Sequence, residues 1–166
     1  ECHPDELVAG GTGSGASEDA LQPKARPDRY EAGTPNTPGI LGLGAAVRFL
    51  ADHAETQQAE EARLVKMLVE GATQLGFRVL GPAADEHRAP IASIVHPELE
   101  ADRLAFALDR RFRVAARAGL HCAPWAHRSL GTIDTGALRF GIGYGTAEED
   151  IVYTLESLAT LVGEGR

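Results

Sequence analysis

The pattern of apolar and polar positions predicts four helices. In four segments apolar residues recur every three or four positions, which places them on one face of a helix. Thr37 and Pro38 have the chemistry of an N-cap and a first helical residue, and Thr146 and Glu149 have the spacing of a capping box. The predicted helices are residues 38–53, 56–75, 98–111 and 146–163.

Short apolar runs between these segments predict strands over residues 77–80, 91–95, 113–116 and 138–142. In the last of them Leu138 and Phe140 alternate with Arg139, which should therefore point away from the face that buries its neighbours. Short strands that are joined by turns or single helices favour an α+β fold. We expect a mostly antiparallel sheet with helices packed on one face.

Glycine and proline dominate the segment before the first predicted helix. Residues 10–15 contain four glycines, and four prolines lie from Pro23 to Pro38. Both residue types disfavour helices and central strands. We therefore predict a connecting segment over residues 1–37 and the small α+β domain over residues 38–166. Backbone N–H groups of the glycine run are able to cradle an anion. The run lacks the lysine of a P-loop, and a flexible linker is the alternative.

The amino-acid composition argues against several classes of function. The chain has 166 residues, 43% of them apolar, which is typical of one soluble domain. Its net charge of -8 argues against a nucleic-acid binder, because neutralising phosphates needs clustered Lys and Arg. No apolar run approaches the roughly 20 residues of a membrane span, and the first residues lack the pattern of a signal peptide. Cys2 and Cys122 form no disulfide framework, so we expect a cytoplasmic protein.

Cys122 lies in a short segment, between a glycine and a proline, that has neither a helix nor a strand period. His121 precedes it directly, and Arg117 and His127 lie within five residues. Cationic neighbours favour the thiolate, which is the nucleophilic form of a cysteine. A reactive cysteine is one hypothesis, and a small inert core residue is another. A metal site with His121 and His127 is a third, although a structural zinc site needs four ligands.

The resemblance to a known family rests on four segments, which occur in the family's order. They are residues 10–14 (Gly-Gly-Thr-Gly-Ser), 29–40, 117–124 and 136–140. Together they resemble the class V aminotransferase-like enzymes, specifically the cysteine desulfurases and selenocysteine lyases. These enzymes depend on pyridoxal 5′-phosphate (PLP) and have the fold type I aminotransferase architecture. The resemblance covers nearly the whole chain and implies that the α+β layer is the small C-terminal domain of such an enzyme.

The resemblance also implies a chemistry for the Cys122 segment. Cys122 would attack the sulfur of PLP-bound L-cysteine, or the selenium of selenocysteine, and carry it away as a persulfide on its own thiol. Arg139 would hold the substrate carboxylate. Arg117 and His121 would hold the loop and favour the thiolate. A sulfur-acceptor protein would then take the sulfur from Cys122.

Three further residues are implied in cofactor binding. Thr34, next to Gly33, resembles the residue that reaches into the neighbouring subunit and binds the PLP phosphate. Thr12 would lie near the same site. This arrangement implies a homodimer, and it implies no resident metal.

The sequence departs from the family in its lysines. The lysine that forms the Schiff base with PLP would follow a histidine in an earlier domain, whereas Lys24 and Lys66 have neither context. We therefore expect these 166 residues alone to be inactive as a desulfurase. A PLP-free sulfur carrier and a dimerisation domain without chemistry of its own are the alternative hypotheses.

Overall fold

The computed structural model describes residues 5, 10, 22–83 and 88–165. Its contacts divide the chain into two compact units, residues 1–53 and 54–166, and each is described by itself. The division into residues 1–37 and 38–166 stays a prediction. No helix among the described residues has both the length and the apolar character needed to cross a membrane.

Helix α1 is continuous over Thr37–Gln74, so the prediction of two helices, 38–53 and 56–75, is wrong. The residues between the two predicted helices, Ala54 and Glu55, are neither proline nor glycine, and both favour a helix. The predicted N-cap is also displaced by one residue. Asn36 Oδ1 accepts a hydrogen bond of 3.1 Å from the Gly39 N–H, which makes Asn36 the cap.

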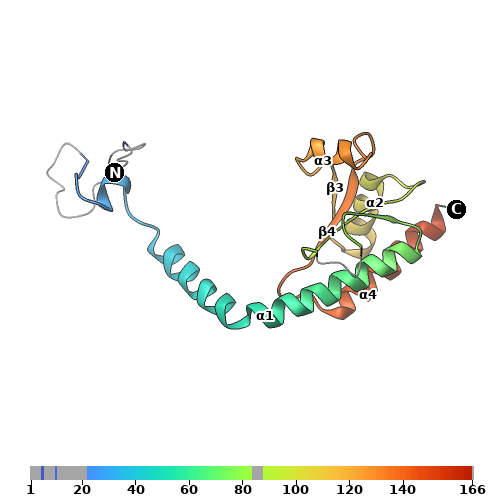
Figure 1. Cartoon of the computed structure of the whole chain (residues 1–166), viewed down its shortest axis with the longest axis horizontal. Helices are drawn as coiled ribbons and strands as arrows, with labels where there is room; N and C mark the ends of the chain where they lie inside the picture. The colour runs from blue at the N-terminus through green and yellow to red at the C-terminus, as the bar shows by residue number, and fades with distance from the viewer. Residues whose placement is uncertain (1–4, 6–9, 11–21, 84–87, 166) are drawn as a thin grey trace. The chain divides into compact units, whose positions relative to one another are not determined.

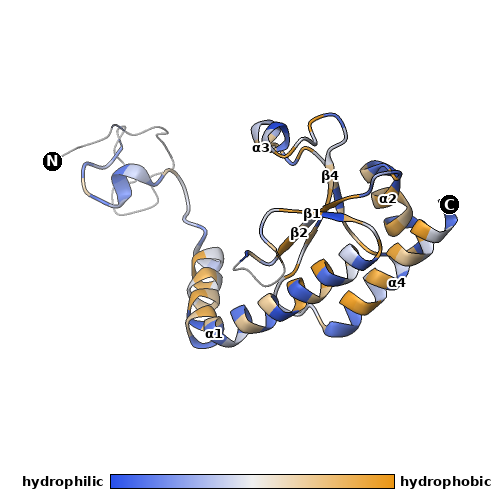
Figure 2. Ribbon diagram, turned by 45° about the vertical axis from the view of Figure 1, so that its right-hand side comes forward, coloured by the Kyte–Doolittle hydropathy of each residue, from blue (hydrophilic) through white to orange (hydrophobic). Residues whose placement is uncertain are grey.

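The first turns of α1 carry apolar side chains that the 1–53 unit leaves exposed. Figure 2 shows this stretch as a nearly continuous run of hydrophobic colour. An isolated exposed apolar side chain is ordinary, whereas a contiguous group marks a contact surface. The exposed apolar residues of this stretch are Ile40, Leu41, Leu43, Val47, Phe49 and Leu50.

In the 54–166 unit, four strands form one antiparallel sheet with the order β1-β2-β4-β3. The predicted mostly antiparallel α+β fold is confirmed. The strands are β1 Arg78–Leu80, β2 Ile91–Val95, β3 Arg117–Gly119 and β4 Ala137–Gly141.

Strand β3 begins four residues later than the predicted strand at 113–116, and that prediction is wrong. The helix before it runs further than expected: α2 (Ala101–Ala107) continues as a π-helical stretch, η2 (Leu108–Phe112). Arg113 then adopts a left-handed conformation with φ of 58° and ends the helix. Pairing with β4 therefore starts only at Arg117.

Helices cover one face of the sheet. The C-terminal part of α1, helix α4 (Glu148–Glu164) and α2 supply the buried apolar side chains that meet those of β2 and β4 (Figure 1). Gly71 marks the closest approach of α1 to α4, because a Cβ at this position would clash with the Leu155 side chain. The core includes Leu64, Leu68, Ile94, Leu104, Leu108, Leu138, Phe140 and Leu158.

Helix α4 confirms the predicted final helix, but its capping box lies one residue later than expected. The Ala147 N–H donates to Asp150 Oδ2 at 2.9 Å. Thr146 Oγ1 instead accepts from the Gly143 N–H at 3.2 Å, and so fixes the turn before the helix. The predicted pairing of Thr146 with Glu149 is therefore wrong.

Candidate active site

Cys122 lies in a tight turn directly after β3. The Ala123 N–H donates to the Leu120 carbonyl oxygen at 2.8 Å, and the two central residues, His121 and Cys122, have φ angles of 54° and 59°. Positive φ at both central positions is the pattern of a type I′ turn, which glycine and asparagine normally occupy. The left-handed backbone conformation costs about 1–2 kcal/mol for each of these two residues. The strained turn leaves the Cys122 thiol exposed.

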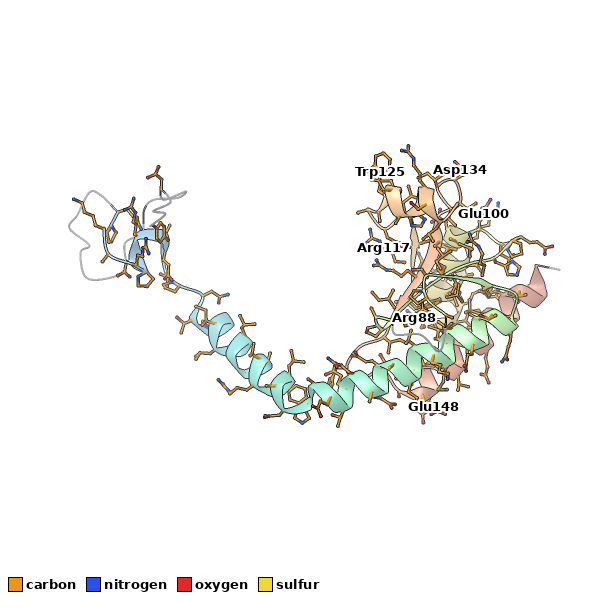
Figure 3. All side chains as sticks on the ribbon, viewed as in Figure 1. Arg88, Glu100, Arg117, Trp125, Asp134 and Glu148 are labelled. Atoms are coloured by element: carbon orange, nitrogen blue, oxygen red, sulfur yellow. The ribbon has the colours of Figure 1, made fainter. Side chains whose placement is uncertain are left out.

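Arg117 places a charged group against the thiol. Its Nη2 lies 3.7 Å from Cys122 Sγ, within the longer range of hydrogen bonds to sulfur. Arg117 and Trp125 both lie on the side of the sheet away from α1 and α4 (Figure 3). A guanidinium at this distance stabilises the negative charge of a thiolate.

Arg139 lies directly opposite Arg117 in the β3–β4 pair and opposite Ser93 in the β2–β4 pair. By strand alternation these three residues share the face that the helices do not cover, while Leu138 and Phe140 are buried on the other. The predicted direction of Arg139 is thus confirmed. In the part of the chain that the structure describes, no carboxylate pairs with Arg139. An open pocket of about 470 Å³ is lined by Ile91, Ala115, Ala116, Arg117, Arg139 and Gly141.

His121 fastens the turn to the sheet. Its Nε2–H donates to the Ala137 carbonyl oxygen at 3.1 Å, whereas its Nδ1 is buried and has no hydrogen-bond partner in the described part of the chain. Burial lowers the pKa of His121 below its ordinary value, and the positive charge of Arg139 lowers it further. The imidazole is therefore held neutral, with its proton on Nε2.

The sequence pattern missed the short helix α3 (Pro124–Ser129), which follows the Cys122 turn. The one available signal was Pro124, which is typical of a first helical position; the helix is too short to show a period. Helix α3 exposes Trp125, with the Arg128 guanidinium 4.8 Å from its ring centre. It also buries His127, to which we assigned no role from the sequence.

Three residues are predicted to bind the cofactor. Two of them, Gly33 and Thr34, are described by the structure and lie in the 1–53 unit. Thr34 is exposed. Gly33 has a φ of 81°, and its N–H donates to the Gly10 carbonyl oxygen at 3.0 Å. Thr12 lies outside the described residues. The roles of all three stay predictions.

The described part of the chain contains no set of ligands that would support the metal hypothesis. No group of three or more His, Cys, Asp or Glu side chains there is arranged to hold a metal ion. His121 and His127 face each other with ring centres 5.7 Å apart, but the Nε2 of His121 is already used by Ala137.

Comparison with known proteins identifies the family. Residues 4–153 match the family described as aminotransferase class-V. The chain belongs to the class-V aminotransferase family. Over 125 residues it is 38% identical to "Probable cysteine desulfurase 2" of Mycobacterium leprae, an alignment that covers 74% of this chain and 29% of that protein. Over 138 residues it is 31% identical to the cysteine desulfurase CsdA of Escherichia coli, covering 81% of this chain and 32% of that protein.

A solved structure of the class-V family shares the fold. The apo cysteine desulfurase from Thermococcus onnurineus NA1 is 30% identical, with a TM-score of 0.78, and the match covers 96% of this chain and 40% of that one. The chain thus spans well under half the length of the class-V relatives it matches.

The lysines of this class-V chain do not fit a complete PLP site. The sequence has two lysines, Lys24 and Lys66. Lys24 is exposed in the 1–53 unit, and the ammonium of Lys66 lies 3.8 Å from the Glu70 carboxylate on α1. Neither lysine follows a histidine in the sequence.

Proposed function

We propose that this chain supplies the persulfide-forming cysteine of a cysteine desulfurase. The observation that carries the proposal is the contact of 3.7 Å between Arg117 Nη2 and Cys122 Sγ, in a turn that exposes the thiol. The names of the class-V relatives support the same activity. The substrate is L-cysteine, and selenocysteine is the alternative, because both present a chalcogen atom to the thiolate.

The proposed reaction transfers one sulfur atom. The Cys122 thiolate attacks the sulfur of L-cysteine, and a sulfur–sulfur bond forms. The carbon–sulfur bond of the substrate breaks, and its electron pair stays with the carbon, which gains a proton to give L-alanine. Cys122 then carries the sulfur as a persulfide. Bound PLP would supply the electron sink for this chemistry.

The residues of this chain divide the work of binding and activation. The Arg139 guanidinium lies on the open sheet face and has no carboxylate partner among the described residues, so it is suited to a two-pronged hydrogen bond with the substrate carboxylate. Arg117 favours the thiolate, and His121 holds the turn. Thr34 binds the PLP phosphate in the site of the neighbouring subunit, Gly33 beside it also contributes to cofactor binding, and Thr12 lies near the same site.

Under this proposal these 166 residues alone are inactive as a desulfurase, because neither Lys24 nor Lys66 follows a histidine as the Schiff-base lysine of the family does. The exposure of Cys122 favours a second candidate function for the chain by itself, that of a PLP-free sulfur carrier. Purified chain with added PLP would then show no aldimine absorbance but would still take up sulfur from a persulfide donor. An aldimine band would exclude the sulfur-carrier function.

The proposal includes two protein partners. A second copy of the enzyme packs against the exposed apolar side chains of residues 40–50, and a sulfur-acceptor protein takes the persulfide sulfur from Cys122. The cytoplasmic location stays a prediction.

The decisive experiment replaces Cys122 with serine in the complete enzyme. We expect PLP absorbance to remain and persulfide formation, measured by mass spectrometry and cyanolysis, to disappear. Cys2→Ser is the matched control, because it removes the other thiol, and it should keep full turnover. Desulfurase turnover that survives Cys122→Ser would refute the proposed role.

A further inference from the structure

A buried polar pair lies under the Cys122 turn and has no part in the chemistry proposed above. His127 of α3 is 5% exposed, and Thr132 of the following loop is 2% exposed. His127 Nδ1 and Thr132 Oγ1 share a hydrogen bond of 2.8 Å. The Thr132 N–H also donates to the His127 carbonyl oxygen at 2.8 Å. Two hydrogen bonds thus lock the place and the rotation of the His127 ring.

The locked ring faces His121. The two ring centres are 5.7 Å apart, and the planes are tilted by 44°. His121 fixes the turn by its bond to Ala137, and it is itself one of the two residues in the left-handed conformation. A turn that neither side chain favours needs outside contacts to persist. The His127 ring supplies such a contact to His121.

The loop that carries this pair is anchored at a second point. Both terminal nitrogens of Arg78, on β1, donate to the Leu130 carbonyl oxygen at 3.3 and 3.4 Å. Strand β1 is the opposite edge of the sheet from β3. The loop after α3 is thus fastened at Arg78 and at Thr132, so His127 cannot withdraw from His121 without breaking these bonds.

We infer that His127 is a positioning residue that, held by Thr132, sets the His121 imidazole and thereby keeps the Cys122 thiol beside Arg117. The inference deepens the proposed desulfurase function, on which it rests for its biological meaning. It assigns no contact between His127 and the substrate.

The test follows two properties of the full 166-residue chain with Cys2→Ser, neither of which needs cofactor or substrate. One is the rate at which iodoacetamide alkylates Cys122. The other is the NMR titration of the His121 ring. The charged groups that face this ring are Arg139 of β4, His127 of α3 and Arg117 of β3.

Two variants break the pair in different ways. Thr132→Val removes the hydroxyl and keeps the shape, and His127→Asn removes the ring but keeps a hydrogen-bonding group for Thr132. In both, water should reach His121 and move its titration up toward the ordinary value. Alkylation at pH 7 should slow about threefold, the size of losing one exposed charge contact at the thiol. Thr132→Ser keeps the hydroxyl and should restore both properties.

Ser157→Ala is the matched control, because Ser157 is a hydroxyl residue of 2% exposure on α4 that bonds to the Tyr153 carbonyl oxygen. It should lower the melting temperature and change neither property. If Thr132→Val and His127→Asn lower the melting temperature but leave alkylation and the His121 titration as in the parent chain, the pair serves only the fold and the inference is wrong. If Thr132→Val does not fold, His127→Asn decides alone. Failure of the desulfurase proposal would appear in the Cys122→Ser experiment and would leave these readouts unchanged.

Discussion

Arg117 on β3 lies directly opposite Arg139 on β4, so two arginines occupy paired positions on the open face of the sheet. Like charges on paired positions repel each other and destabilise a sheet. No carboxylate neutralises either of them within the described residues. An arrangement that costs stability and leaves a positive surface beside an exposed thiol is suited to an anionic substrate.

Replacing Arg139 with alanine in the complete enzyme should mainly weaken substrate capture. The change removes a charged hydrogen-bond pair worth about 2–3 kcal/mol. The apparent KM for L-cysteine should therefore rise about 30-fold or more, at 1.4 kcal/mol for each factor of ten. Arg103→Ala is the control, because Arg103 on α2 forms an exposed ion pair with Glu100, and we assign it no role at the thiol or on the open sheet face. An unchanged KM in the Arg139 variant would contradict the carboxylate-binding role.

Replacing Arg117 with alanine should slow the alkylation of Cys122 at pH 7. The exposed contact at 3.7 Å is worth about 0.2–1 kcal/mol. The rate constant for iodoacetamide should therefore fall about 1.5- to 5-fold, in a chain that carries Cys2→Ser. Salt should lower the rate in the parent chain more than in the variant, because it screens the charge. Equal rates at low salt would mean that Arg117 does not stabilise the thiolate.

Local sequence rules were enough to predict the parts of this site that depend on one strand or helix. The direction of Arg139 follows from the two-residue period of Leu138 and Phe140. The α4 helix follows from its apolar stripe. The sequence predicts two helices where the structure has the single helix α1, because no residue between 53 and 56 breaks the helix.

Long-range relationships were beyond the same rules. The alignment of Arg117 with Arg139 depends on where β3 begins, and this in turn depends on the left-handed Arg113 that ends η2. The turn conformation at Cys122 could not be predicted from local sequence either. Its positive φ angles contradict the preferences of His121 and Cys122 and exist only because tertiary contacts hold them.

The lowered pKa of His121 makes stability depend on pH in a defined direction. The unfolded chain takes up a proton at this histidine near pH 6.5, whereas the folded chain resists protonation until lower pH. The unfolded state therefore binds more protons in this window, and the free energy of unfolding should fall as pH decreases from 7.5 to 5.5. Urea unfolding at the two pH values measures this difference.

In His121→Gln the loss of stability between pH 7.5 and 5.5 should be smaller than in the parent chain. His53→Gln is the control, because His53 lies in the 1–53 unit and bonds through Nδ1 to the Phe49 carbonyl oxygen. It should keep the parental difference. A His121 variant with the full parental difference would show that this histidine does not carry the effect.

The apolar stretch at the start of α1 predicts self-association. Leu43 and Val47 are 66% and 57% exposed and lie one turn apart on the helix. Changing both to glutamate places two charges in the proposed interface and should shift the sedimentation coefficient from dimer to monomer. Asp52→Ala, an exposed polar change on the same helix, should leave association unchanged. A dimer that survives the double change must use another surface.

The two ends of the Cys122 loop meet at a pair of glycines. Gly136 has a φ of 63°, and a Cβ there would lie 2.8 Å from the Gly119 Cα, which is backbone and cannot rotate away. Gly131 is the matched control: it belongs to the same loop and has a φ of 69°, but nothing lies within 4 Å of an added Cβ. The two positions differ mainly in whether an added Cβ would meet nearby backbone atoms.

Gly131→Ala should therefore cost only the left-handed conformation, about 1–2 kcal/mol in the free energy of unfolding. Gly136→Ala should cost this and a further 1–3 kcal/mol or so for the clash with backbone. Because the clash separates β3 from β4 at the point where the Cys122 loop begins and ends, it should also slow alkylation of Cys122. Urea unfolding and alkylation of the two variants measure both effects. Equal losses of stability would mean that the Gly119–Gly136 contact does not constrain the loop.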